Sequence, residues 1–137
     1  MPPDPRRVAD TEGWLKRVES DLRAAEVDLA AVPALLGDSA FHSQQAVEKA
    51  LKALLTWHDI PFRRTHDLAE LGHQCALLDA SIEPICRRAE RLTAFAWVFR
   101  YPGDVEEPTR QEAEDALALA HEVHAAVLQR LPEAGRS

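Results

Sequence analysis

Cysteine and glycine are both scarce in this chain. The two cysteines, Cys75 and Cys86, form no CxxC pair and have no metal-ligand spacing, so we expect two reduced, buried thiols rather than a disulfide framework or a cysteine-based metal site. The five glycines are isolated from one another. Because a phosphate-binding loop needs closely spaced glycines, the chain builds neither GxGxxG nor GxxxxGKS/T. GxSxG and HExxH are also absent, which excludes the hydrolase sites that these motifs form.

Long apolar runs and an excess of positive charge are missing as well. No stretch approaches the roughly 20 apolar residues that span a bilayer, and the first residues contain no apolar run of the kind found in signal peptides. Lys and Arg total 16 against 23 Asp and Glu, a net charge of −7. Because phosphate contacts dominate nucleic-acid affinity, general DNA or RNA binding is disfavoured. We expect a cytoplasmic protein that binds neither a membrane nor nucleic acid.

Amphipathic helices account for nearly all of the 137 residues. Apolar residues recur at spacings of three and four over about 10–31, 38–59 and 109–131, and two further helices are expected over about 67–78 and 81–100. No segment alternates apolar and polar residues, so no sheet is expected. The pattern predicts an all-α fold, an antiparallel up-and-down helical bundle of four long helices plus one short helix. The bundle domain is expected over 10–132, with flexible tails over 1–9 and 133–137.

Several helix starts carry capping signals. Asp38 or Ser39 offers an N-cap oxygen to the second helix, and Thr65 offers one to the third. Thr109 followed by Glu112 fits the T-x-x-E capping box of the fifth helix.

The fourth helix departs from amphipathic patterning. Its segment TAFAWVF, Thr93–Phe99, is apolar on every side. In a small bundle each helix keeps one face toward solvent, so we predict a homodimer interface formed by Phe95, Trp97 and Phe99. The alternative is that Phe95 lies in the core and Trp97 is half covered.

The second helix has a polar side, in the stretch FHSQQAVEKALKALL. His42, Gln45 and Lys49 line up at spacings of three and four, and Glu48 with Lys52 is expected to be a plain surface pair. Such a face is either idle solvated surface or a site. Two polar groups at other helix ends favour a site: His66 in RRTHDL, and Arg100 in FRYPG. Helix ends are places where anions bind.

Four stretches in succession, WLKRVESDLRAAE, AFHSQQAVEKALKALL, RTHDL and FRYPG, resemble the signatures of the HEPN domain (higher eukaryotes and prokaryotes nucleotide-binding). The resemblance runs from about Trp14 to Leu128. It implies an all-α bundle that is usually a homodimer. It also implies that the chain acts beside a separate minimal nucleotidyltransferase as a toxin–antitoxin pair, or is a ribonuclease.

Ribonuclease members of that family carry an Arg, four to six residues, and then a His. The resemblance implies that such a His moves the proton of the RNA 2′-hydroxyl and that the Arg holds the phosphate. In this chain Arg100 is followed by Tyr-Pro-Gly-Asp-Val-Glu-Glu, and none of the six histidines has an Arg at the required distance upstream. The departure argues against ribonuclease activity.

The favoured hypothesis is a non-catalytic HEPN protein that homodimerises and binds a nucleotide, a minimal nucleotidyltransferase, or both, in a toxin–antitoxin-type system. The expected ligand contacts are His42, Gln45, Lys49, His66, Arg100 and Tyr101. Two alternatives stay open: a divergent ribonuclease toxin, and a structural helical adaptor. Apart from a nucleotide ligand we expect no cofactor. We also expect no metal, because His121 and His124 have no evident third ligand and His124 lies on an apolar stripe, as a hydrogen-bonded core histidine does.

Overall fold

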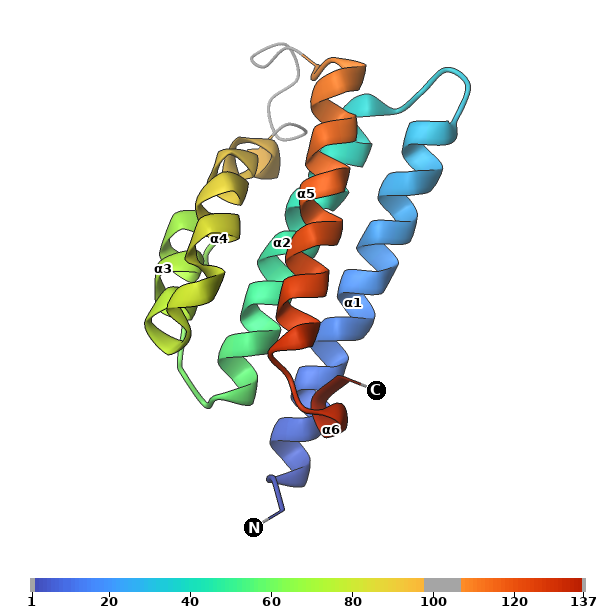
Figure 1. Cartoon of the computed structure of the whole chain (residues 1–137). Helices are drawn as coiled ribbons and strands as arrows, with labels where there is room; N and C mark the ends of the chain where they lie inside the picture. Colours follow the sequence, from blue (N-terminus) through green and yellow to red (C-terminus); the bar gives the residue numbers. More distant parts are fainter. Residues whose placement is uncertain (1, 98–106, 137) are drawn as a thin grey trace.

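The computed structural model describes residues 2–97 and 107–136. Three long helices lie side by side, and two shorter ones, α3 and α4, pack together on one side of α2 (Figure 1). The elements are α1 (Pro5–Ala30), α2 (Leu36–Trp57), α3 (Leu68–Leu78), α4 (Glu83–Ala89), α5 (Arg110–Gln129) and α6 (Glu133–Arg136), with the 3-10 segments η1 (Ala80–Ile82) and η2 (Glu90–Trp97). The described residues contain no strand, and the all-α class is confirmed.

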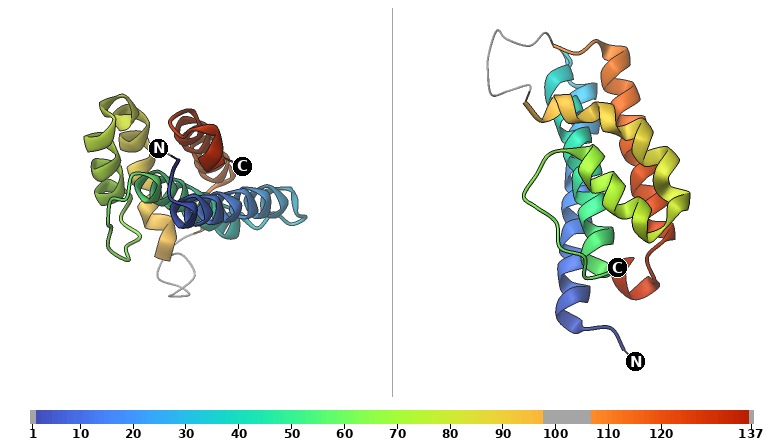
Figure 2. Two further views of the ribbon diagram at one scale, coloured as in Figure 1. Left: turned by 90° about the horizontal axis from the view of Figure 1, so that it is seen from below. Right: turned by 90° about the vertical axis from the view of Figure 1, so that its left-hand side faces the viewer.

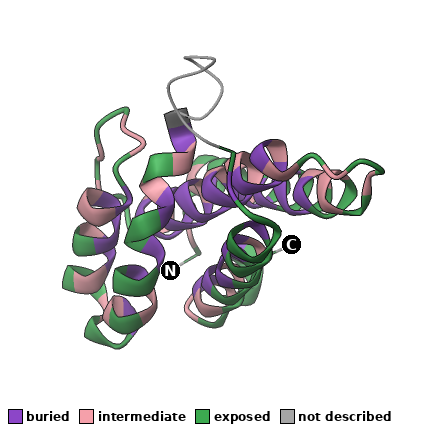
Figure 3. Ribbon diagram, turned by 90° about the horizontal axis from the view of Figure 1, so that it is seen from above, coloured by how far each residue is buried: buried purple, intermediate pink, exposed green. Residues whose placement is uncertain are grey.

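Helix α2 is the centre of the molecule. It contacts α1, α5, α3 and η2, and the views along the bundle place it between α1 and the shorter helices (Figure 2). Small residues Ala46, Ala50 and Ala53, all fully buried, let the flanking helices approach closely, and Leu51 and Leu54 fill the space between them. Buried residues therefore gather on the inward faces of the helices (Figure 3).

The helix directions do not alternate strictly. Helix α1 runs antiparallel to α2, whereas α2 and α5 run in the same direction (Figure 1). The segment 58–67 leads back along the bundle before α3 begins, so α3 and the α4–η2 segment complete one further down-and-up pair (Figure 1).

Helix α1 begins earlier than its apolar pattern indicates. Asp4 Oδ1 accepts a hydrogen bond from Arg6 N at 2.9 Å, and Pro5 occupies the first helical position, where its missing N–H does no harm. Residues 5–9, expected in a tail, are therefore helical. The short α6 likewise occupies 133–136.

The start of α2 corrects the predicted cap. The helix begins at Leu36, ahead of Asp38 and Ser39, and no side chain caps it. Ser39 is fully buried and its hydroxyl donates to the α1 carbonyl of Ala25 at 2.8 Å. Its polar atom is used to join two helices rather than to start one.

The end of α2 is a Schellman turn. Ile60 N donates to Leu55 O at 2.9 Å and Asp59 N donates to Thr56 O at 3.1 Å. Asp59 has a φ of 57°, the left-handed region that glycine adopts most readily. Pro61 follows one residue later, so the chain leaves the helix at this point.

The expected fourth helix over 81–100 is instead a series of shorter pieces. Asp79 caps η1 by accepting from Ser81 N at 2.9 Å, α4 follows, and η2 continues as a 3-10 helix. Thr93 Oγ1 in η2 accepts from Leu68 N at 3.1 Å, one of the N–H groups that α3 leaves unpaired at its start. This contact ties η2 to α3.

The other two caps are settled by hydrogen bonds. Asp67, not Thr65, is the N-cap of α3, since its side chain accepts from Ala69 N at 3.0 Å. The capping box of Thr109 and Glu112 at α5 is confirmed. Across the described residues, no helix is both long and apolar enough to cross a membrane.

Candidate functional site

The polar side of α2 is largely covered by its neighbours. Gln44 is 0% exposed, Glu48 3% and Lys52 7%. The expectation of a plain surface pair between Glu48 and Lys52 is therefore wrong. Because α2 is the central helix, α1 and the segment after α2 cover the side that its sequence pattern assigns to solvent. These buried groups need partners, since an unpaired polar group in the interior costs free energy.

Asp21 of α1 supplies the first partner. Its Oδ1 lies 3.0 Å from His42 Nδ1 and its Oδ2 lies 2.6 Å from Lys49 Nζ. Asp21 is 8% exposed, and both of its oxygens are used by α2. A single carboxylate thus joins a histidine and a lysine that lie two turns apart on one helix.

Glu48 of α2 repeats the same arrangement. Its Oε1 lies 2.7 Å from His66 Nδ1 and its Oε2 accepts from Lys52 Nζ at 2.9 Å. Gln44 Nε2 also donates to Glu48 Oε1 at 3.2 Å, and Gln45 Nε2 donates to Gln44 Oε1 at 2.6 Å. His66 precedes α3, so Glu48 joins α2 to the segment that crosses between α2 and α3.

Aromatic rings cover the buried end of this network. Lys52 Nζ lies 5.6 Å from the ring centroid of Trp14 and 5.7 Å from that of Phe62. The two rings meet edge to face at 6.3 Å. The carboxylate and the two aromatic rings replace the water that Lys52 loses on burial, so they stabilise its positive charge inside the protein.

We call this network the polar seam: Asp21, His42, Gln44, Gln45, Glu48, Lys49, Lys52 and His66. Both histidines face a carboxylate through Nδ1. Since an ionised carboxylate only accepts, Nδ1 of each histidine is the donor in these two contacts. The side chains of His42 and His66 are 37% and 35% exposed, so they form the outer edge of the seam.

The structure brings together four of the six predicted ligand contacts. His42, Gln45, Lys49 and His66 all belong to the polar seam. Arg100 and Tyr101 lie outside the described residues. Lys49 is paired with a carboxylate inside the protein, which weakens its attraction for an external phosphate.

The two carboxylates that organise the polar seam were not predicted as site residues. Asp21 lies three residues after Val18 and four before Ala25, both fully buried, so it belongs to the apolar stripe of α1. A carboxylate in such a stripe signals a buried partner. That spacing was the available signal.

The predicted interface falls mostly outside what the structure describes. Phe95 is partly buried and packs against the core. The side chain of Trp97 and the whole of Phe99 lie outside the described residues.

Burial shifts the pKa of three further titratable groups, Cys75, Cys86 and His124. Burial raises the pKa of the Cys75 thiol, and it raises that of Cys86 to about 11, so both stay protonated, unreactive thiols. Burial lowers the pKa of His124, whose buried Nε2 has no hydrogen-bond partner in the described part of the chain. The prediction of a hydrogen-bonded core histidine is therefore wrong for this atom. His121 pairs with Glu26 at 2.8 Å, and the described residues hold no cluster of three metal-ligating side chains.

Comparison with known proteins assigns the chain to a family. Residues 11–131 match the family model described as HEPN domain. The chain belongs to the HEPN family. The seam and the bundle around it are thus features of a HEPN domain, and the resemblance noted in the sequence is confirmed.

One relative of this HEPN domain has a name that describes it as a toxin. It is named "Putative toxin MJ1304", from Methanocaldococcus jannaschii, and is 32% identical over 124 residues, which cover 80% of each chain. No solved structure matches this HEPN domain significantly.

Proposed function

We propose that this chain is a non-catalytic HEPN protein of a toxin–antitoxin-type system, which homodimerises and acts through a nucleotide, a minimal nucleotidyltransferase partner, or both. The observation that carries the proposal is the combination of a family match over 11–131 with a toxin-named relative 32% identical to the chain. Members of this family occur in toxin–antitoxin pairs. Whether this chain acts by catalysis or by binding depends on its site residues.

Two features support a role without catalysis. The sequence after Arg100 has no His where ribonuclease members carry one. The two histidines of the polar seam each hold a carboxylate at 2.7–3.0 Å through Nδ1, and each carboxylate also holds a lysine. Groups engaged in this way fix α1, α2 and the 58–67 segment relative to one another. The polar seam is, on this proposal, mainly a device for stability.

A nucleotide would meet the outer edge of the polar seam. There His42, Gln45 and His66 retain partial exposure, and Arg100 with Tyr101 would add a phosphate contact and a stacking ring. Isothermal titration with ATP and GTP tests this half. We expect binding that is weakened by Arg100→Ala and by Gln45→Ala. If the titration shows no heat of binding at millimolar ATP or GTP, nucleotide binding is removed from the proposal. The protein partner then remains.

The protein partner and the dimer are tested by mass. Light scattering on the pure chain is expected to give a dimer, and Trp97→Glu is expected to give a monomer. Coexpression with a minimal nucleotidyltransferase encoded beside the gene is expected to give one complex on gel filtration. If the chain is monomeric and the two proteins elute separately, the dimer and the nucleotidyltransferase partner are both removed from the proposal.

A divergent ribonuclease is the second candidate, and one observation favours it. The pairs Asp21–His42 and Glu48–His66 have the geometry of a carboxylate that orients a general base. This candidate predicts growth arrest on expression and RNA cleavage that is lost in His66→Ala. Intact RNA after prolonged incubation with the pure protein rules it out.

A further inference from the structure

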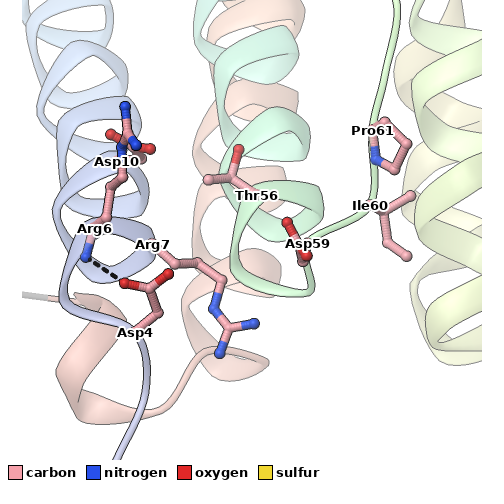
Figure 4. Close-up of a pocket in the computed structure, with 8 residues that line it drawn as sticks. All are labelled: Asp4, Arg6, Arg7, Asp10, Thr56, Asp59, Ile60 and Pro61. Atoms are coloured by element: carbon pink, nitrogen blue, oxygen red, sulfur yellow. Dashed lines mark hydrogen bonds between the residues drawn. The ribbon is translucent and has the colours of Figure 1, made fainter.

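Two neighbouring hollows lie beside the first half of α1. One hollow of about 500 Å³ is lined by Asp4, Arg6, Arg7, Asp10, Thr56, Asp59, Ile60 and Pro61 (Figure 4). A neighbouring hollow of about 380 Å³ shares Asp10 and Thr56 and adds Trp14 and Arg17. We call the two together the arginine groove. It follows α1 along its first half and is closed on the other side by the end of α2.

The arginines of this groove have no ion-pair partner among the described residues. Arg6, Arg7 and Arg17 make none, although Asp4, Asp10 and Asp59 line the same groove. Some arginines outside the groove are paired with carboxylates, as Arg88 is with Glu122 at 3.0 Å, whereas Arg23, Arg64, Arg91 and Arg136 make no such pair among the described residues. In a protein of net charge −7, guanidinium groups left open beside carboxylates indicate a surface that pairs with something else.

Two of these guanidinium groups are held in place by aromatic rings. Arg7 Cζ lies 5.6 Å from the ring centroid of Trp57, and Arg17 Cζ lies 5.7 Å from that of Trp14. Arg7 Nε is buried and has no hydrogen-bond acceptor within the described residues. Figure 4 shows the Arg7 side chain reaching from α1 toward the end of α2. A stacked, preoriented guanidinium loses little entropy when it binds an oxyanion through two parallel N–H groups.

The spacing of the two stacked arginines selects the kind of ligand. Arg7 and Arg17 are ten residues apart on α1, which is roughly 15 Å along a helix that rises about 1.5 Å per residue. A single phosphate or carboxylate cannot reach both. An extended peptide rises about 3.3 Å per residue, so acidic side chains four or five residues apart would match.

The groove carboxylates argue for a peptide over RNA. Asp4, Asp10 and Asp59 lie among the arginines, and a nucleic-acid strand would bring a phosphate against them at every step. A peptide can place neutral residues there and carboxylates only at the arginines. We propose that the arginine groove binds an extended, acidic segment of a partner protein. The inference rests on the proposed function only in taking the partner to be a protein.

The test uses the full chain and a synthetic probe. The probe is a fluorescein-labelled Gly–Ser peptide with two glutamates about five residues apart, and the readout is anisotropy at low ionic strength, where charge pairing is least screened. We expect Arg7→Gln and Arg17→Gln each to weaken binding about five- to tenfold. The matched control is Arg88→Gln, an arginine already paired within the chain, which is expected to bind like the parent.

Further arms separate the sources of an effect. Arg17 is exposed, so Arg17→Gln keeps the test valid if Arg7→Gln disturbs the packing on Trp57. Arg7→Lys keeps the charge but not the two-pronged geometry and is expected to lie between Arg7→Gln and the parent. A probe with glutamines in place of glutamates is expected not to bind. Equal binding by the parent and both Gln variants, or tighter binding of a single-stranded RNA oligonucleotide than of the peptide, overturns the inference. Neither result tests the dimer or the nucleotidyltransferase complex, which are measured separately by light scattering and gel filtration.

Discussion

The polar seam and the arginine groove both border Trp14 and differ in how their positive charges are paired. In the seam each lysine meets a carboxylate of the same chain, at 2.6 Å for Lys49 and 2.9 Å for Lys52. In the groove, within the described part of the chain, Arg6, Arg7 and Arg17 meet none. Trp14 contacts both regions, facing Lys52 from the seam and Arg17 from the groove.

We infer that the paired charges of the seam stabilise the fold, whereas the unpaired arginines of the groove are available for binding. A buried lysine is tolerated only when its partner is supplied internally, so the groups of the seam are committed to the folded state. Two of the groove arginines, Arg7 and Arg17, face aromatic rings that hold them in position and make no ion pair with the described residues. Variants of the seam should therefore change stability, and variants of the groove should change binding.

The largest expected loss of stability follows from a substitution at Glu48 in the polar seam. Glu48→Gln leaves Lys52 buried without its counter-charge and removes the anchor of His66, so the free energy of unfolding in urea should fall by about 3–5 kcal/mol. The matched control is Glu114→Gln in the exposed i,i+4 pair with Arg110, expected to change stability by less than about 1 kcal/mol.

A double variant sharpens that result. Glu48→Gln combined with Lys52→Met removes both charges, and part of the loss should return because no unpaired charge is left inside. If the double variant is as unstable as the sum of the two single variants, the pair does not act as a unit.

The next effect compares two aspartates of α1. Asp21→Asn weakens the contacts to His42 and Lys49, and we expect a loss of about 1–3 kcal/mol in the free energy of unfolding. Asp28 is on the same helix, but burial raises its pKa and its buried Oδ2 has no hydrogen-bond partner among the described residues. Asp28→Asn should therefore be neutral or stabilising. A larger loss at Asp28 than at Asp21 would contradict the role of the seam.

A smaller effect of opposite sign is expected in the groove. Asp59 has a φ of 57°, so Asp59→Gly should raise the free energy of unfolding by about 0.5–1 kcal/mol. His58→Gly is the matched control, because His58 has a φ of −89° and gains nothing from glycine there. If glycine is more stable than Asp59 at this position, the aspartate is retained at a cost in stability, as is common for residues at binding sites. If Asp59→Gly lowers stability, the side chain has a structural role instead.

The smallest effect concerns His124 and its dependence on pH. Burial lowers the pKa of His124, with Glu19 opposing and His121 adding to the shift. Below the ordinary histidine pKa of about 6.5 the unfolded chain binds a proton that the folded chain refuses, so stability falls as pH drops. His124→Leu should flatten the decline between pH 7 and 5, by no more than about 1 kcal/mol. Parallel curves for the two proteins would show that His124 is not the cause.

The helices could be predicted from sequence because each carries its own local signal. The capping box of Thr109 and Glu112 starts α5 as its motif indicates, and the apolar spacings locate α1 and α2. The fourth helix could not be placed as well, since the hydrogen bond from Leu68 to Thr93 that ties η2 to α3 spans 25 residues.

The seam was missed for a similar reason. An i,i+4 Glu–Lys pair has the same pattern whether a helix is central or at the surface. Only the tertiary arrangement around α2 makes Glu48 and Lys52 buried. The four residues His42, Gln45, Lys49 and His66 lie together in the structure, but their role as ligand contacts stays a prediction, and their partners lie on other elements or one turn away. Local spacing identifies a polar face and does not tell what covers it.

Side-chain NMR tests the division between seam and groove most directly. In the ¹⁵N-labelled protein, the arginine Nε–Hε and lysine Nζ signals are followed while the two-glutamate peptide is added. We predict shifts for Arg7 and Arg17 and none for Lys49 and Lys52, because the lysines are already paired within the protein. Shifts of the lysine signals with unmoved arginines would contradict the assignment of folding to the seam and binding to the groove.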